Sequence, residues 1–294
     1  MKIFFKLLTL AFFISILNSC TDVVQIKLDE GSKLYVIDAF VNDLRISQTI
    51  KVVTNDSYFS NRDAPAVPNA NVVLTDLTGN IQYNFNYTSN GNYVYNLSPA
   101  DTIAKTNHQY KLDVTIDGVV YTSMATQKRS AIIDSISSLP NDGGGFGPPS
   151  KNSTFFCLLN ARDIADNNPD YYWIKTFRND TLFNGSADIN VCIDGTGGIV
   201  TDAPNNTVEF TPPAIFLGFK QYKKLDICKV EIHSTSRETY FFFVQALGQI
   251  TNGGLFATTP ENVKTNITTP SGAKTKAVGW FNMATVAVQT KVVK

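Results

Sequence analysis

Residues 81–95 read IQYNFNYTSNGNYVY, and this stretch decides which fold the sequence predicts. From 81 to 87, apolar or aromatic residues alternate with polar ones, which is the pattern of a strand with one buried face. Asn90-Gly91 follows, and this dipeptide adopts the positive φ angles of a tight hairpin turn at little cost. Tyr93 and Tyr95 then resume the alternation. We therefore expect two antiparallel strands joined by a hairpin.

A second hairpin follows this one, and further strand patterns precede it. Residues 110–116 alternate, turn at Asp117-Gly118 and return through 119–121. Earlier segments share the strand pattern, namely 34–41, 49–54 and 71–77. About seven strands within roughly a hundred residues are typical of a sandwich. We therefore expect an immunoglobulin-like or transthyretin-like sandwich over residues 34–130.

A second β-rich domain is expected over residues 131–294. Ile132 to Ile136 begins it, and the Pro/Gly-rich stretch from 140 to 149 follows. We interpret that stretch as a long hairpin loop rather than a linker, because 132–136 would otherwise have no strand to pair with. The remaining strand segments are 154–160, 171–177, 187–193, 207–210, 225–233 and 277–292. This domain is expected to be a sandwich or a partly open barrel.

One helix is predicted near residues 236–248. Thr235 and Glu238 have the spacing of a capping box. Apolar side chains then fall on one helical face, from Tyr240 to Leu247, before Gly248. Because an apolar face must be buried, we expect the helix to pack across a sheet or to plug one end of a barrel.

The first twenty residues predict export and lipid attachment. Lys2 and Lys6 precede an apolar run over 7–17, which is shorter than the roughly 20 residues of a membrane-spanning helix and fits a signal peptide. The run ends at Leu17-Asn18-Ser19-Cys20, which resembles the bacterial lipobox, although its second residue departs from the usual small one. We expect residues 1–19 to be a lipoprotein signal peptide. Cys20 would then carry several acyl chains, enough for a stable membrane anchor, and residues 20–33 would form a tether.

Composition and charge argue against several classes of function. Lys plus Arg and Asp plus Glu number 25 each, so no nucleic acid is expected as a partner. Only His108 and His233 are present, which excludes a multi-histidine metal site and restricts nucleophilic catalysis. Both histidines are expected at the surface or in capping roles. No dinucleotide, P-loop or HExxH motif occurs. We expect no catalytic residues and no cofactor.

Three cysteines remain once Cys20 is assigned to lipid, and an odd number cannot form a closed set of disulfides. Cys157 and Cys228 lie in apolar strand patterns, and none of the three has Cx2C metal spacing. We expect free thiols in the core. A single bridge, in any of three pairings, is the alternative in an oxidising compartment.

Two groups of residues are candidates for binding. Asp163, Asp166 and Asp170 lie in an oxygen-rich loop of the kind that calcium prefers. Its spacing does not match an EF-hand, and Asp and Asn are common in ordinary turns, so no metal is expected. Several aromatic residues are candidates for stacking on a sugar ring or packing on a partner, namely Tyr58, Phe59, Trp173, Trp280 and Phe281.

Several short motifs occur together in one order along the chain. They are the lipobox cysteine, Leu34-Tyr35-Val36-Ile37, Asp163-Ile164-Ala165-Asp166, Pro169-Asp170-Tyr171-Tyr172-Trp173, Tyr240, Gly254-Leu255-Phe256, Asn262-Val263-Lys264-Thr265-Asn266-Ile267 and Ala277-Val278-Gly279-Trp280-Phe281. Together they resemble the bacterial cell-envelope lipoproteins catalogued as domain of unknown function 4249, over nearly the whole chain. Gly279-Trp280-Phe281 stands where that family more often has Gly-Tyr-Phe.

This resemblance implies an outer-membrane lipoprotein, often encoded beside a TonB-dependent receptor, with no established enzymatic activity. It supplies no catalytic residues to carry over. We therefore expect a non-catalytic accessory lipoprotein that binds a transporter, a ligand for import, or both. A surface module that binds a glycan or a peptide on its own is the alternative, and a hydrolase is the least favoured reading.

Overall fold

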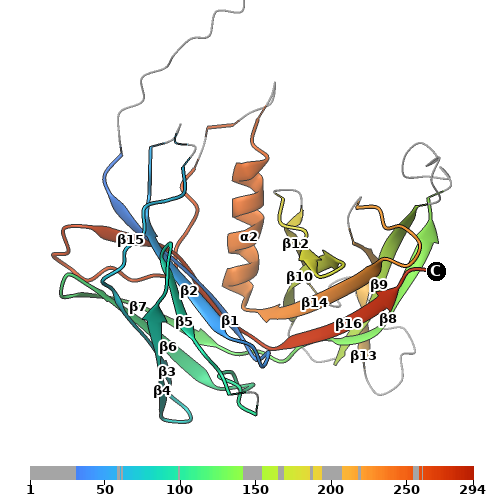
Figure 1. Cartoon of the computed structure of the whole chain (residues 1–294), viewed down its shortest axis with the longest axis horizontal. Coiled ribbons are helices and arrows are strands. Elements are labelled where there is room, and N and C mark those ends of the chain that lie inside the picture. Colours follow the sequence, from blue (N-terminus) through green and yellow to red (C-terminus); the bar gives the residue numbers. More distant parts are fainter. Residues whose placement is uncertain are drawn as a thin grey trace, which may run out of the picture. The chain divides into compact units, whose positions relative to one another are not determined.

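Strands dominate the computed structural model, and one helix lies among its described residues (Figure 1). The described residues are 31–57, 60, 62–98, 100–141, 154–164, 169–185, 188–193, 207–217, 220–253, 258–259 and 261–294. The chain divides into two compact units, of which one comprises Met1–Ser32 with Ser57–Ser60. The other comprises Lys33–Asp56 with Asn61–Lys294, and it contains every element described below. The mainly β architecture with a packed helix is confirmed.

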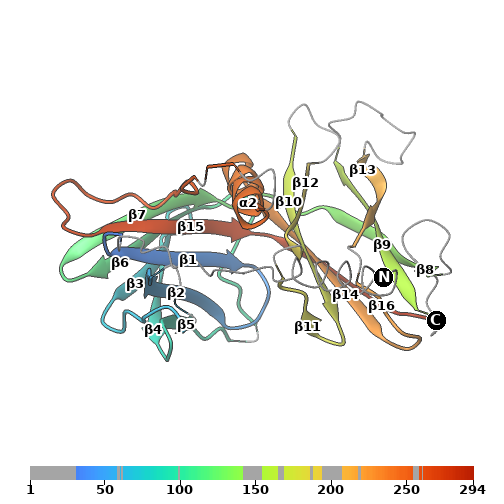
Figure 2. The same cartoon turned by 90° about the horizontal axis from the view of Figure 1, so that it is seen from above.

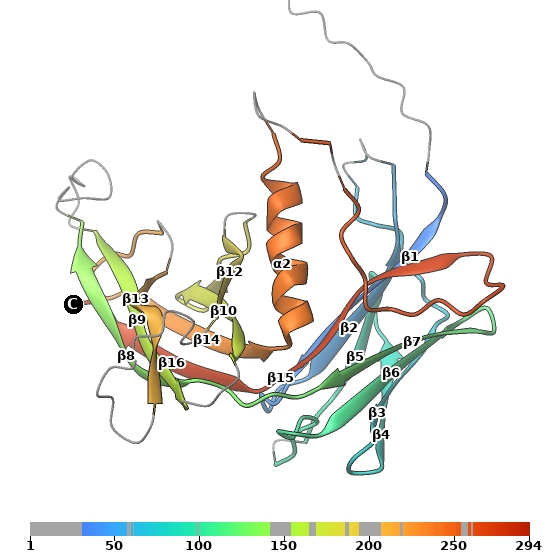
Figure 3. The ribbon, with the colours of Figure 1, turned by 180° about the vertical axis from the view of Figure 1, so that it is seen from behind.

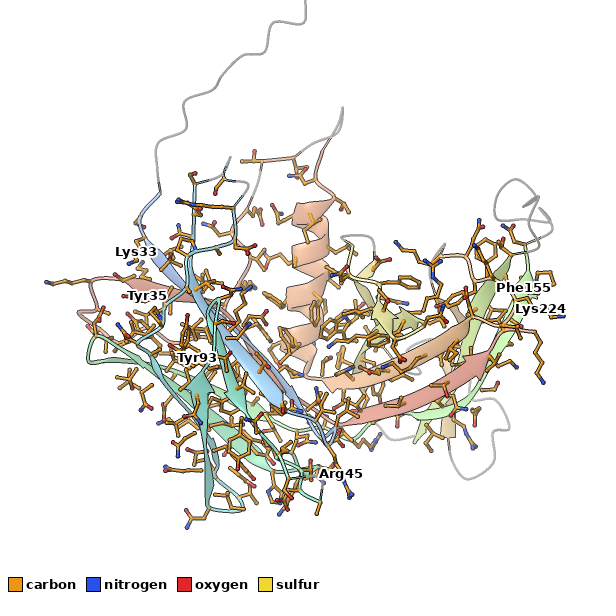
Figure 4. All side chains as sticks on the ribbon, viewed as in Figure 1. Lys33, Tyr35, Arg45, Tyr93, Phe155 and Lys224 are labelled. Atoms are coloured by element: carbon orange, nitrogen blue, oxygen red, sulfur yellow. The ribbon has the colours of Figure 1, made fainter. Side chains whose placement is uncertain are left out.

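An eight-stranded sheet contains all the strands predicted before residue 130 and one strand from near the end of the chain. In hydrogen-bonded order it comprises β15 (Lys276–Ala284), β1 (Leu34–Asn42), β2 (Gln48–Thr54), β5 (Asn92–Tyr95), β4 (Ile81–Tyr87), β3 (Asn71–Asp76), β6 (Gln109–Ile116) and β7 (Val119–Thr126). Side chains from both ends of this order, Ile37 of β1 and Val114 of β6 among them, share the first hydrophobic core. Figure 4 labels Tyr35 and Tyr93 of this core.

The two predicted hairpins are confirmed. Asn90 and Gly91 have φ angles of 50° and 80°, and Asp117 and Gly118 have φ angles of 51° and 78°. These left-handed values are those that the Asn-Gly and Asp-Gly dipeptides adopt most cheaply. The strands that they connect pair in antiparallel ladders.

β15 lies parallel to β1 over their whole lengths, from Leu34 opposite Lys276 to Asn42 opposite Ala284 (Figure 2). Gly279 lies opposite Ile37 and has a φ of 117°. A Cβ at this position would overlap the backbone carbonyl of Ile37, which no side-chain movement can relieve. The glycine of the Gly-Trp-Phe motif is therefore a requirement of strand packing.

The free edge of β15 is covered by a short segment around Asn266. The amide side chain of Asn266 donates to the Phe281 carbonyl at 2.7 Å and accepts from the Phe281 N–H at 2.8 Å, as a neighbouring strand would. Ile267 enters the first core, and Thr268 pairs with Thr122 of β7. The Asn262-to-Ile267 motif thus bridges the two ends of the first sheet.

Two further sheets are built from residues beyond 131. One has the order β11 (Thr181–Leu182), β10 (Tyr171–Arg178), β14 (Ile227–Thr235) and β16 (Val286–Val292), with β12 (Asn190–Ile193) also paired to β10. The other has the order β13 (Thr207–Phe216), β9 (Phe155–Ile164) and β8 (Ile132–Pro140) (Figure 3). Because β8 and β9 pair antiparallel, the interpretation of 140–149 as a hairpin connection is confirmed, although residues 142–153 lie outside the described chain.

The second hydrophobic core takes side chains from both of these sheets. Cys157 of β9 and Cys228 of β14 are buried in it, as their apolar surroundings predicted. Both are free thiols in the structure, and Cys192 is half-buried.

The expected strand over 277–292 is wrong in one respect, because it is two strands in two sheets. β15 belongs to the eight-stranded sheet and β16 to the sheet of β14, with Thr285 between them. The Thr285 N–H donates to the Ser234 hydroxyl at 2.8 Å, and its carbonyl accepts from the Ser234 N–H. The first sheet therefore includes a strand from beyond the predicted boundary at residue 131.

The predicted helix exists as α2 (Arg237–Ile250), but its predicted cap is wrong. The N-cap is Ser236, whose hydroxyl accepts from the Thr239 N–H at 3.1 Å. Thr235 is still the last residue of β14, and its buried hydroxyl makes no hydrogen bond to the start of the helix. The helix passes Gly248 and is capped by Thr251. No helix among the described residues is long and apolar enough to cross a membrane.

The close approach of β15 to β1 can be tested with a pair of glycine variants. We expect Gly279→Ala to lower the free energy of unfolding by about 3 kcal/mol or more, because the methyl group meets backbone. Gly272 also has a positive φ, of 82°, but open space around it. Gly272→Ala should therefore lower the free energy of unfolding by only about 1–2 kcal/mol, which is the strain of an alanine held at positive φ. Urea unfolding of both variants measures the difference, and equal losses would contradict the steric explanation.

Candidate ligand-binding cleft

A cleft of about 650 Å³ is lined by outward-facing residues of the first sheet, by β10 and by α2. Strand alternation explains which side chains face it. On β1, Tyr35 and Ile37 enter the first core, so Asp38 and Phe40 lie on the opposite face and line the cleft. On β10, Tyr172 and Ile174 enter the second core, so the residues between and after them face away from it. The two sheets thus turn their non-core faces toward one space.

Asp38 occupies the centre of the wall formed by the first sheet. In register it lies opposite Trp280 of β15 on one side and Lys51 of β2 on the other. Both of those residues also line the cleft. The facing wall carries Trp173 and Lys175 of β10.

Aromatic rings connect the walls to α2. Phe40 lies 5.3 Å from Trp173 and 5.4 Å from Phe243, measured between ring centroids, and Trp173 lies 4.6 Å from Phe243. Phe242 stacks on Trp280 at 4.5 Å. Aromatic pairs at these separations stabilise a fold beyond the area that they bury. The cluster therefore forms a fixed apolar wall shared by β1, β10, β15 and α2.

Trp280 is held on three sides and is almost fully buried. Its indole N–H donates to the Thr239 hydroxyl at 2.9 Å, and that hydroxyl donates to the Asn282 side chain at 3.1 Å. Because Ser236 and Thr239 begin α2, these bonds fasten the start of the helix to β15. Trp280 thus contributes a ring edge to the cleft while its polar atom is already satisfied.

Asp38 is an exposed residue of β1, and its side chain reaches solvent through the cleft. Desolvation by the surrounding cleft raises the pKa of its carboxyl group, and the attraction of Lys175 and Lys51 opposes that shift. Within the described parts of the chain, no hydrogen bond or ion pair holds the Asp38 side chain. Its carboxylate oxygens are therefore available to accept hydrogen bonds from a molecule in the cleft.

Lys175 crosses the face of Trp173, with Nζ 4.1 Å from the ring centroid. Burial lowers the pKa of the Lys175 ammonium group, while Glu231 and Asp38 favour its charge. No carboxylate among the described residues lies within ion-pair distance of it. The cation–π contact fixes where this charge stands in the cleft.

A buried polar group lies beside Trp173 and Lys175, on the neighbouring strand β14, where His233 and Glu231 are in register with them. His233 Nε2 and Glu231 Oε2 are 3.0 Å apart, and Lys229 Nζ lies 3.5 Å from the other Glu231 oxygen. Burial lowers the pKa of His233 to about 4, so the neutral ring donates to the carboxylate. The expectation of a surface or capping role for His233 is therefore wrong. His108 does lie in a turn, 2.8 Å from the Asp76 carboxylate.

The structure brings together only some of the residues that the sequence singled out. Trp173 and Trp280 both line the cleft. Phe281, one residue later, points to the opposite face of β15 and is buried in the first core. Tyr58 and Phe59 lie outside the described residues, as do Cys20 and the predicted signal peptide.

The candidate calcium residues are bound to an arginine. Arg129 Nε lies 3.3 Å from Asp163 Oδ1, and its Nη2 lies 2.5 Å from Asp170 Oδ2. The Tyr172 hydroxyl also donates to Asp163, and Asp166 lies outside the described residues. In the described ranges no three His, Cys, Asp or Glu residues are grouped as a metal site would need. The guanidinium group occupies the position that a cation would require.

Sequence reasoning missed the charged residues of the cleft. Asp38 interrupts an otherwise apolar strand, and Lys175 follows Trp173 on the same face of the next sheet. An acidic residue at an outward position of a largely apolar strand was the available signal. It does not reveal which other strands face that position, because their pairing is set by the fold.

The fold and the cleft define a mainly β protein with a largely apolar cleft that also contains charged side chains. The chain belongs to the family described as domain of unknown function DUF4249, which matches residues 21–290. No curated protein matches the chain. Among solved structures, it is similar to a chain from a study of host cell surface retention of a 1.5-MDa bacterial ice-binding adhesin. The identity is 14% and the TM-score 0.19, over 91% of this chain and 66% of that chain, so no shared fold is established.

The buried histidine predicts a specific loss of stability in mild acid. Below a pKa of about 6.5 the unfolded chain binds a proton at this histidine, but folded His233 stays neutral down to about pH 4. The contribution of neutral His233 to the free energy of unfolding is therefore fully present above about pH 6.5. It falls as the pH is lowered from about 6.5 towards 4. We expect the protein to lose on the order of 1 kcal/mol of unfolding free energy between about pH 7.5 and 5.5 from this group.

Urea unfolding at the two pH values measures this loss, and the His233→Gln variant should lack it. His108→Gln is the matched control, because this variant keeps the buried His233 and should still lose stability in mild acid. A His233→Gln protein with the same acid sensitivity as the wild type would contradict the assignment.

Proposed function

We propose that this protein is a lipid-anchored, non-catalytic accessory protein of the bacterial outer membrane that binds an organic ligand and acts with a TonB-dependent receptor in its uptake. The cleft carries the proposal. Its volume of about 650 Å³ lies within the roughly 300–1,000 Å³ typical of small-molecule sites. Apolar walls with a few polar groups that lack partners, here Asp38 and Lys175, are also typical of such sites.

The residues at the cleft favour binding over catalysis. Its described lining contains no histidine, cysteine or serine, the residues on which nucleophile–base pairs are most often built. His233, opposite Trp173 on the neighbouring strand β14, is buried and engaged with Glu231. This distribution supports a binding protein over a hydrolase.

The anchor rests on the first twenty residues and on the family. The apolar run and the Leu17-Asn18-Ser19-Cys20 sequence support cleavage before Cys20. The family match begins at residue 21, directly after that cysteine. A chain held at a membrane by several acyl groups would remain beside an integral receptor long enough to deliver a ligand.

The anchor predicts the behaviour of one cysteine variant. We expect Cys20→Ala to abolish labelling with radioactive palmitate and to move the protein from the membrane fraction to the soluble fraction. Cys192→Ala is the control, since it removes a half-buried thiol outside the signal segment and should leave labelling intact. Circular dichroism should show the same β content in both variants. Fatty-acid labelling of Cys20→Ala would refute the anchor.

The partner can be tested in intact cells of the source organism. Chemical crosslinking followed by affinity purification should recover a TonB-dependent β-barrel receptor with the wild-type chain. The Cys20→Ala variant should recover much less of it, because the unanchored chain is diluted away from the membrane. Repeated recovery of the wild-type chain without any receptor would favour the stand-alone glycan- or peptide-binding module instead.

A further inference from the structure

We propose that the cleft selects organic anions, binding an apolar or aromatic body against its aromatic wall and an anionic group between Lys175 and Lys51. This inference rests on the proposed function, since it names the class of ligand that the same cleft would hold. It follows from the balance of charge in the cleft and from the way in which its aromatic rings are already engaged.

The charged side chains that line the cleft leave a net positive charge. Lys51 and Lys175 each carry one ammonium group, and Asp38 supplies the only carboxylate among the described lining residues. Glu231, opposite Lys175 on the neighbouring strand β14, is already engaged by His233 and Lys229. An anion that enters between the lysines therefore supplies countercharge that the described chain does not provide there.

The two lysines disfavour a cationic ligand, even one placed beside the Asp38 carboxylate. Asp38 lies in register with Lys51 on the neighbouring strand, and Lys175 approaches it from the facing wall. A ligand cation seated at Asp38 would thus meet two ammonium groups close by, and like charges at short range repel each other. An anionic group avoids that repulsion and gains both lysines.

The lysine of the facing wall is positioned before any ligand arrives. Lys175 Nζ stands 4.1 Å from the centroid of Trp173, and that ring is held by Phe40 and Phe243. A charge fixed in this way loses little conformational entropy on binding, which favours affinity. Lys175 is therefore the residue on which anion binding should depend most.

The aromatic rings act as an apolar wall more than as a platform for sugar stacking. Phe242 covers one face of Trp280, and Lys175 covers one face of Trp173. The Trp280 N–H is also used by Thr239, so it cannot bond a ligand hydroxyl. A neutral sugar would find few free ring faces here, whereas the apolar body of an organic acid needs only contact.

Two fluorescent probes with the same ring system distinguish charge selection from simple apolar binding. Anilinonaphthalene sulfonate is anionic, and phenylnaphthylamine is its neutral counterpart; both gain fluorescence in apolar sites. We expect the purified mature chain to bind one molecule of the sulfonate per cleft, as measured by calorimetry and fluorescence. Lys175→Met should weaken this binding about tenfold or more, and Lys51→Met less.

Other variants complete the test. Asp38→Asn should tighten sulfonate binding several-fold, because it removes a repelling charge, a result that general unfolding of a variant cannot mimic. Lys274→Met is the control, since this lysine is exposed and outside the cleft. Affinity for the neutral probe should stay within about twofold in all four variants, as expected of binding by apolar contact alone.

The outcomes separate the two proposals. Binding of both probes with no effect of Lys175→Met, or weaker sulfonate binding in Asp38→Asn, would overturn anion selection and leave a ligand-binding cleft. Failure of both probes to bind would overturn the cleft as a ligand site altogether.

Discussion

The parallel ladder between β1 and β15 is the constraint on which the rest of the structure depends. It brings residues 276–284 to the first strand of the chain, and β16 then continues directly into the sheet of β14. Both sheets are thus fixed to each other through Thr285 and its bonds to Ser234. The ladder needs Gly279, because only a residue without a side chain fits against the Ile37 backbone. The position of Asp38 relative to Lys175 follows from this arrangement.

Polar groups near the cleft are divided between two roles. Glu231, His233 and Lys229 satisfy one another, which is how buried polar side chains avoid the cost of lost hydration. Asp38 and Lys175, in contrast, attract each other without forming an ion pair. The aromatic cluster keeps the two walls apart and fixed. Asp38 and Lys175 are therefore available to interact with a ligand, whereas Glu231, His233 and Lys229 are not. This difference supports a binding function.

Local patterns predicted much of the fold, and long-range pairing explains what they missed. The Asn90-Gly91 and Asp117-Gly118 hairpins, the β8–β9 pairing and the existence of α2 were predictable, because each depends on neighbouring residues. Residues 277–292 contain no proline and no turn dipeptide near Thr285, so nothing local marks the change of sheet there. Trp173 and Trp280 were found by residue type, but Asp38 and Lys175 gain meaning only when β1 faces β10.

The central claim is that β15 is an integral strand of the first sheet, so that the two ends of the chain form the cleft together. Amide hydrogen exchange on the full mature chain, followed residue by residue, tests it most directly. Because the two strands are hydrogen-bonded to each other, the amides of the β1–β15 ladder should exchange slowly and become exposed in the same opening event. Protected β1 amides beside β15 amides that exchange orders of magnitude faster would contradict the account.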